Sequence, residues 1–138
     1  MAEVTRFGVS IEKDLIDKFD KAIKKENYSN RSEAIRDLIR EKFVKEEWTT
    51  GGDVAGTITV IYDHHRRDLV NKLIDIQHDT HDLIVSGQHI HLDHHNCMEI
   101  IVVRGQAEKA KQLADKLRSV KGVKFGQLSM ASTGKNLI

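Results

Sequence analysis

A short alternating stretch near the start of the chain restricts its fold more than any other feature. In TRFGVSI, residues 5–11, the apolar side chains of Phe7, Val9 and Ile11 alternate with small or polar ones. This period of two predicts a β-strand with one apolar face. No second strand is predicted in the first fifty residues, so its backbone donors and acceptors need a partner from elsewhere. The simplest partner is the same strand of a second copy, related by a twofold axis.

Two helices are predicted to follow this strand and to cover its apolar face. Leu15, Phe19 and Ile23 recur every four residues, which is the stripe of one helix. After a break at 27–30, Asn30 and Glu33 have the spacing of an N-cap and its reciprocal acid. The buried stripe of the second helix is then expected at Ile35, Leu38, Ile39 and Phe43.

The outer face of the paired strands is expected to carry Arg6, Gly8 and Ser10 in duplicate. A two-stranded ribbon fits the major groove of double-stranded DNA, where such side chains suit base edges. The segment NRSEAIRDLIR, residues 30–40, resembles the second helix of ribbon-helix-helix DNA-binding domains, and the resemblance covers roughly residues 4–46. The alternative is a dimerisation module without a nucleic-acid partner, in which Arg6 is merely solvated.

The segment KEEWTTGGDVAG, residues 45–56, lacks periodicity and reads as a connection between domains, with a boundary near Gly51. This divides the chain into residues 1–50 and 51–138. The second part alternates strand and helix periods in the order βαββαβ, the ferredoxin-like pattern of ACT-type regulatory domains. The expected class is therefore α+β. The strands are expected at 57–63, 82–93, 97–105 and 123–132, and the helices at 66–79 and 106–120.

Composition sets few further limits. The formal net charge is only +1, so any DNA binding must come from local geometry and not from bulk charge. Neither an apolar leader nor a run of eighteen apolar residues is visible, which makes a cytoplasmic protein the simplest expectation. The single cysteine, Cys97, cannot form an internal disulfide and is either inert, a nucleophile or a metal ligand.

The stretch GQHIHLDHHNC, residues 87–97, predicts a metal site. His89 and His91 lie two apart on one strand and so share a face, with Ile90 and Leu92 expected on the opposite, core side. After the turn, Cys97 can face back toward the two imidazoles. Thiolate and imidazole together suit late transition metals and not magnesium or calcium, but spacing leaves zinc, nickel and copper open.

A fourth ligand is not decided by spacing. His78 and His81 end the preceding helix, and one of them could come from a neighbouring copy of the chain. His94 and His95 are interpreted as solvated residues of the turn. A rival interpretation makes Cys97 a nucleophile with His91 as its base, but no oxyanion loop is evident, so we do not expect an enzyme.

QHDTHD with His78, HIHLDHHNC, and the ribbon-helix-helix start together resemble the NikR nickel-responsive regulators over nearly the full chain. The resemblance implies a square-planar Ni(II) site formed by His89, His91 and Cys97 of one protomer and His78 of another. It also implies a homotetramer that binds operator DNA and represses nickel uptake genes.

Other residues are carried over from the same resemblance. Arg6, Gly8 and Ser10 would read DNA, although threonines are expected at the last two positions.

The resemblance also covers residues outside the strand. The basic pair Arg66 and Arg67 would contact phosphate, and the acids Glu33 and Asp37 would form a second, cation-dependent contact between domains. The alternative is a ribbon-helix-helix regulator that responds to copper, zinc or a small molecule. Five further histidines are left open as auxiliary ligands, namely His64, His65, His81, His94 and His95.

Overall fold

The structure is a computed structural model and describes residues 3–138. Contacts within the chain divide it into two compact units, Met1–Phe43 with Leu137–Ile138, and Val44–Asn136. Within the described residues, no helix combines the length and apolar character needed to cross a membrane.

The N-terminal unit contains helix α1 (Lys13–Lys25) and the first turns of helix α2 (Arg31–Thr50). The predicted break between them is confirmed, since Asn27 adopts the left-handed backbone conformation with φ of 68°. Asparagine is among the few residues that visit this conformation readily. Asn30 caps α2 as predicted, because its side-chain oxygen accepts a hydrogen bond of 2.9 Å from the Glu33 backbone N–H.

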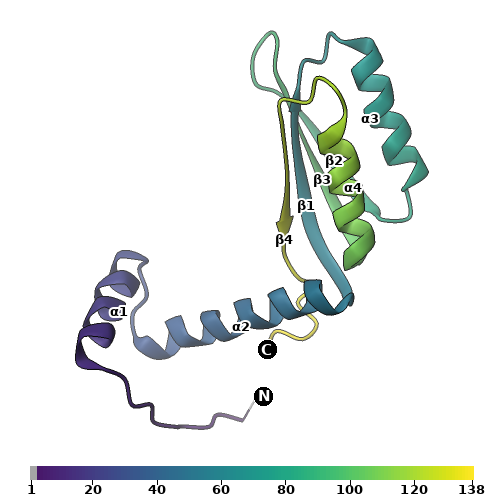
Figure 1. The fold of residues 1–138 in the computed structure, drawn as a ribbon. Helices are drawn as coiled ribbons and strands as arrows, with labels where there is room; N and C mark the ends of the chain where they lie inside the picture. The colour runs from purple at the N-terminus through teal and green to yellow at the C-terminus, as the bar shows by residue number, and fades with distance from the viewer. Residues whose placement is uncertain (1–2) are drawn as a thin grey trace. The chain divides into compact units, whose positions relative to one another are not determined.

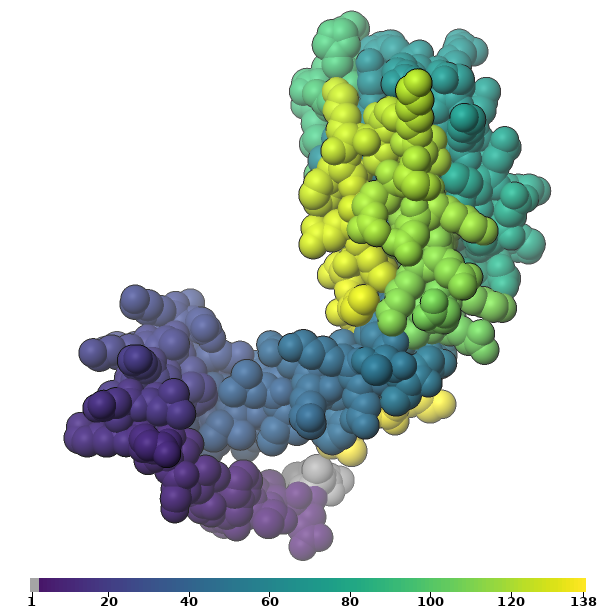
Figure 2. All heavy atoms as spheres, viewed as in Figure 1, coloured from purple at the N-terminus to yellow at the C-terminus, as the bar shows by residue number. Residues whose placement is uncertain are grey.

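Residues 3–12 precede α1 and make no strand pairing within the single chain. Figure 2 shows them as an extended run of purple atoms. The apolar face of the predicted strand is exposed, with Phe7 at 71% and Val9 at 62% of full accessibility. An apolar stripe of this kind is costly to leave in water. Its pairing with a second copy stays a prediction that this exposure favours.

The prediction of a connection over residues 45–56 was wrong. Residues 45–50 continue α2, and strand β1 (Asp53–Tyr62) begins two residues after Gly51, which ends the helix with φ of 80°. The physical reason is Trp48, which is 2% exposed and donates from its indole N–H to the Ala131 carbonyl at 2.8 Å. Its burial in the C-terminal unit holds the last turns of α2 in that unit.

The C-terminal unit confirms the predicted βαββαβ order and the α+β class. After β1 come α3 (Arg67–Asp79), β2 (Ile84–His91), β3 (Cys97–Gln106), α4 (Ala107–Ser119) and β4 (Phe125–Met130). The antiparallel sheet has the strand order β2-β3-β1-β4. Helices α3 and α4 cover one face of this sheet (Figure 1).

The core lies between the helices and that sheet face. Alternate residues of β1 point into it, among them Ile58, Val60 and Tyr62, each 1% exposed. They pack with Leu73 of α3 and Leu117 of α4 in a single cluster. Tyr62 is the last residue of β1 and points toward the helices. Residues of neighbouring strands that lie directly opposite Tyr62 therefore face the helices as well.

Candidate metal centre

Strand register brings two of the predicted ligands together. His91 of β2 is the direct cross-strand partner of Cys97 in β3, and Cys97 in turn faces Tyr62 in β1. Directly opposed residues of antiparallel strands point to the same face, with Cβ atoms about 4.5–5.5 Å apart. The imidazole of His91 and the thiol of Cys97 are therefore neighbours on the helix-covered face.

His89 lies on the same face, one row further along the sheet, opposite Glu99. The Tyr62 hydroxyl donates to the Glu99 carboxylate at 2.7 Å and lies 3.1 Å from Nε2 of His89. A hydroxyl has one proton, so after donating to Glu99 it accepts from His89. This arrangement places the imidazole proton on Nε2 and leaves Nδ1 of His89 free to bind a metal ion.

Helix α3 joins this network through Gln77, whose side-chain amide donates to the other Glu99 oxygen at 2.8 Å. Tyr62, Glu99 and Gln77 were not predicted to belong to this site. One signal was available, since the alternation in TITVIYD turns Tyr62 inward, and a buried tyrosine hydroxyl requires a hydrogen-bond partner.

Cys97 is fully buried, with an exposed fraction of 0%. Burial, followed by the nearby charge of Glu99, raises the pKa of its thiol. The thiol is thus protonated near neutral pH in the protein alone, and a metal ion that binds there must displace the proton. Such a site discriminates in favour of ions with high affinity for sulfur.

An unsatisfied imidazole lies beside the predicted ligands. The His64 ring is 4.5 Å from that of His91, and its buried Nδ1 has no hydrogen-bond partner among the described residues. Burial, followed by the neighbouring His65 and His91, lowers the pKa of His64 and keeps it neutral. A buried nitrogen of this kind is satisfied by an ordered water or an ion. The imidazole and thiol donors of His89, His91 and Cys97 fit a bound transition-metal ion.

The predicted fourth ligand, His78, lies in the last turn of α3 and is exposed. It lines a pocket of about 420 Å³ together with His81, His89, Tyr62 and Glu99. Within residues 3–138, no three of the four predicted ligands have ligand atoms within 4.8 Å of one another. His78 and His89 thus line the same pocket, but the four predicted ligands do not close on one point in the single chain.

The predicted orientation of the β2 strand was wrong in one respect. His89 and His91 share a face, but it is the face covered by helices, and Ile90 and Leu92 lie on the other. Leu92 is 51% exposed. The prediction assumed that apolar residues occupy the core side, whereas at this end of the sheet the Tyr62 hydroxyl, held by Glu99, provides a polar partner for the His89 imidazole.

The predicted DNA-contacting residues Arg6, Gly8 and Ser10 are all exposed in the unpaired segment. Arg66 and Arg67 stand at the start of α3, and the Arg66 guanidinium lies against Gly122. Their roles stay predictions.

The two acids of the predicted interdomain cation site have partners within the N-terminal unit. Asp37 accepts from the Tyr28 hydroxyl at 2.6 Å and from Arg40 at 2.9 Å. The Tyr28 hydrogen bond is the main cause that lowers the pKa of Asp37, so this carboxylate is ionised. Glu33 lies 3.7 Å from Arg36. The cation role of Glu33 and Asp37 stays a prediction.

Comparison with known proteins identifies both parts of the chain. Residues 55–131 match the NikR C terminal nickel binding domain, and residues 5–46 match the ribbon-helix-helix protein, copG family. Part of the chain also has a fold similar to that of an uncharacterised protein from Thermotoga maritima, with a TM-score of 0.50 at 13% identity, over 55% of this chain and 94% of that one.

Full-length relatives agree with these matches. A protein of Syntrophus aciditrophicus is 56% identical over 98% of both chains, and one of Chlorobium limicola is 54% identical over 97% of this chain and all of its own (100%). One of Pyrococcus furiosus is 53% identical over 98% of this chain and 99% of its own. Each is named "Putative nickel-responsive regulator". This chain therefore belongs to the NikR family of nickel-responsive regulators, which bind DNA through a ribbon-helix-helix domain and are not enzymes.

Proposed function

We propose that the protein represses nickel uptake genes and that Ni(II), bound between subunits, raises its affinity for operator DNA. His89, His91 and Cys97 of one subunit and His78 of another would hold the ion in a homotetramer. The observation that carries this proposal is the shared sheet face of His89, His91 and Cys97, with a hydrogen-bond network that leaves Nδ1 of His89 free. When bound, nickel supplies a bridge between subunits.

The position of His78 supports a ligand shared between chains. His78 follows Gln77, which is hydrogen-bonded to Glu99, and so stands at the pocket edge on an exposed helix end. It does not close on the strand ligands of its own chain. An exposed imidazole at this edge is accessible to the incomplete ligand set of a second subunit.

The coupling between metal and DNA follows from linkage. If nickel favours the arrangement of subunits in which both ribbons reach their half-sites, it must tighten DNA binding. Operator DNA must then tighten nickel binding by the same factor. The ribbon residues Arg6, Gly8 and Ser10 would read the operator, and Arg66 and Arg67 would contact its phosphates.

Fluorescence anisotropy tests this function directly. The probe is a labelled duplex enriched from a random pool by the nickel-loaded protein. We expect one equivalent of Ni(II) per chain to tighten DNA binding by about 5–150-fold, the usual range of allosteric coupling. Equal affinity with and without nickel would contradict the proposal. Parallel titrations with Zn(II) and Cu(II) test the other effectors, because sulfur and imidazole ligands accept these ions as well.

Replacing Tyr62 by phenylalanine tests the hydrogen-bond network behind the ligands. The change keeps the buried ring and removes the hydroxyl that orients His89. We expect nickel affinity to fall by about 10–100-fold, as is typical when partners of metal ligands are lost. Competition with a chelator of known affinity measures this change.

Tyr28→Phe is the matched control, since it removes a hydroxyl bonded to Asp37 at 2.6 Å, in the other unit. Its nickel affinity should equal that of the wild type. Wild-type affinity in Tyr62→Phe would show that the network does not orient the ligand.

A further inference from the structure

The turn that leads from His91 to Cys97 contains a polar network outside the proposed nickel ligands. Residues 92–96 connect β2 to β3, and the two predicted ligands are direct cross-strand partners on either side of this turn. A slip of β2 by one residue against β3 would turn the His91 side chain to the opposite face of the sheet. The two ligands therefore share a face only while this register is kept.

The apolar pattern at the end of β2 does not explain the observed register. Leu92 is 51% exposed on the face away from the helices, and a slip by one residue would turn it toward them, which burial of apolar area favours. The far end of β2 gives little help, because its pairing with β3 is irregular between Ile84 and Ser86. Polar interactions must therefore fix the register. One of them joins Tyr62 to His89 at 3.1 Å, and the turn provides others.

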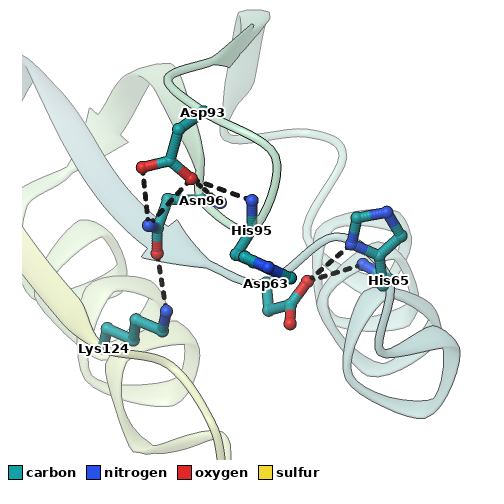
Figure 3. Close-up of polar contacts among 6 residues, drawn as sticks. All are labelled: Asp63, His65, Asp93, His95, Asn96 and Lys124. Atoms are coloured by element: carbon teal, nitrogen blue, oxygen red, sulfur yellow. Dashed lines mark hydrogen bonds and ion pairs between the residues drawn. The ribbon is translucent and has the colours of Figure 1, made fainter.

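An aspartate closes the turn through four hydrogen bonds. Oδ1 of Asp93 accepts from the backbone N–H groups of His95 and Asn96, both at 2.8 Å, and from Nδ2 of Asn96 at 3.0 Å (Figure 3). Its Oδ2 accepts from the same Nδ2 at 2.9 Å. The Asn96 carbonyl in turn accepts from the Leu92 backbone N–H at 2.9 Å. Such local bonds determine the conformation of a turn, and turn geometry sets the register of a hairpin.

A lysine just before β4 fastens this turn to the sheet. Nζ of Lys124 donates to Oδ1 of Asn96 at 2.6 Å (Figure 3). The Lys124 backbone is itself held, because its N–H donates to the Ile61 carbonyl of β1 at 2.8 Å. The amide of Asn96 therefore has both ends occupied, Nδ2 by the Asp93 carboxylate and Oδ1 by an ammonium group, and hydrogen bonds to charged groups are the stronger kind.

We propose that Asp93, Asn96 and Lys124 are positioning residues, which fix the register of the turn so that His91 faces Cys97 before any metal ion binds. The network ties the β2–β3 turn to β1, a strand that does not slip with β2. Preorganised ligands bind an ion more tightly, since they are already ordered in the folded protein. That the two ligands hold nickel rests on the proposed function, whereas the register of the turn does not.

Disulfide formation reports this register without any metal. In full-length protein with His91→Cys, the introduced thiol lies opposite Cys97 at a Cβ separation of about 4.5–5.5 Å, close to the span of a disulfide. In the slipped register the two thiols point to opposite faces and cannot join. Glutathione disulfide is the oxidant, and mass spectrometry measures the intramolecular bond. Adding Asp93→Ala or Asn96→Ala should slow its formation by at least about tenfold, because each lost hydrogen bond lowers the population of this register by about 2–10-fold.

Lys124→Met tests the link to β1 and leaves the hydrogen bonds within the turn intact, so it should slow the disulfide by about 2–10-fold. Lys121→Met is the matched control, since it removes the same charge from an exposed lysine close by and should leave the rate unchanged. Asp93→Asn keeps an oxygen for the two backbone N–H groups and should restore most of the rate lost in Asp93→Ala. If Asp93→Ala does not fold, the two lysine variants still decide the outcome.

Wild-type rates in Asp93→Ala and Lys124→Met, or an equal loss in Lys121→Met, would overturn the proposal. With the native His91, Asp93→Ala should also bind Ni(II) about 10–100-fold more weakly in competition with a chelator of known affinity. A wild-type chain that binds no nickel at Cys97 would refute the proposed function, and the disulfide rates would still decide whether the turn network fixes the register.

Discussion

Cys97→Ala is expected to abolish the nickel response of DNA binding. The change removes the only sulfur ligand, and with it the absorption band of thiolate-bound nickel. DNA affinity with nickel should fall to the value without nickel, a loss of about 5–150-fold. Anisotropy titrations with and without Ni(II), together with absorption spectra of the same samples, measure both effects.

The controls for this variant address folding, because Cys97 is fully buried. Cys97→Ser keeps the size of the side chain and offers a hard oxygen in place of a soft sulfur, so it should lose the same band. His94→Gln leaves all proposed nickel ligands in place and should retain the full response. A Cys97→Ala protein whose DNA affinity still rises with nickel would exclude this thiol from the switch.

Local periodicity predicted the course of the chain well. The N-cap at Asn30, the break at Asn27 and all four strands of the C-terminal unit follow from turn chemistry and alternation. These features depend on neighbours in sequence, and such neighbours determine backbone conformation directly. The continuation of α2 through Trp48 was missed because it depends on a contact with Ala131, 83 residues further along the chain.

The metal ligands were also only partly predictable. That His89 and His91 share a face follows from alternation, but which face carries them depends on register with Glu99 and Tyr62. An apolar residue such as Leu92 normally indicates the core side, and here it does not. The polar partner of His89 is the Tyr62 hydroxyl of another strand, and the sequence of β2 alone contains no information about it.

The roles of His78 and of the predicted strand at 5–11 could not be settled for a different reason. Both are incomplete within one chain, since His78 does not close on its predicted partner ligands and Phe7 remains exposed. The unpaired strand by itself already predicts a second copy. The exposed apolar face is consistent with that inference, which can be tested by removing apolar area from the face.

Phe7→Ala is expected to destabilise the N-terminal unit and to abolish DNA binding. Phe7 is 71% exposed in the single chain, and pairing of two strands would bury it in both copies. Each buried phenylalanine contributes about 1.5–3 kcal/mol, so the symmetric pair loses roughly 3–6 kcal/mol. Circular dichroism should show a lower melting transition for the helices of this unit, and anisotropy should show no binding of the nickel-dependent DNA probe.

Arg6→Ala distinguishes loss of pairing from loss of DNA contacts, since Arg6 is expected on the opposite, outward face of the same strand. Its melting transition should match that of wild type, while DNA affinity falls by about 10–100-fold through the loss of a contact to bases. If Phe7→Ala melts and binds DNA as wild type does, the segment does not form the paired ribbon. If Arg6→Ala lowers the melting transition instead, the two faces of the strand have been assigned the wrong way round.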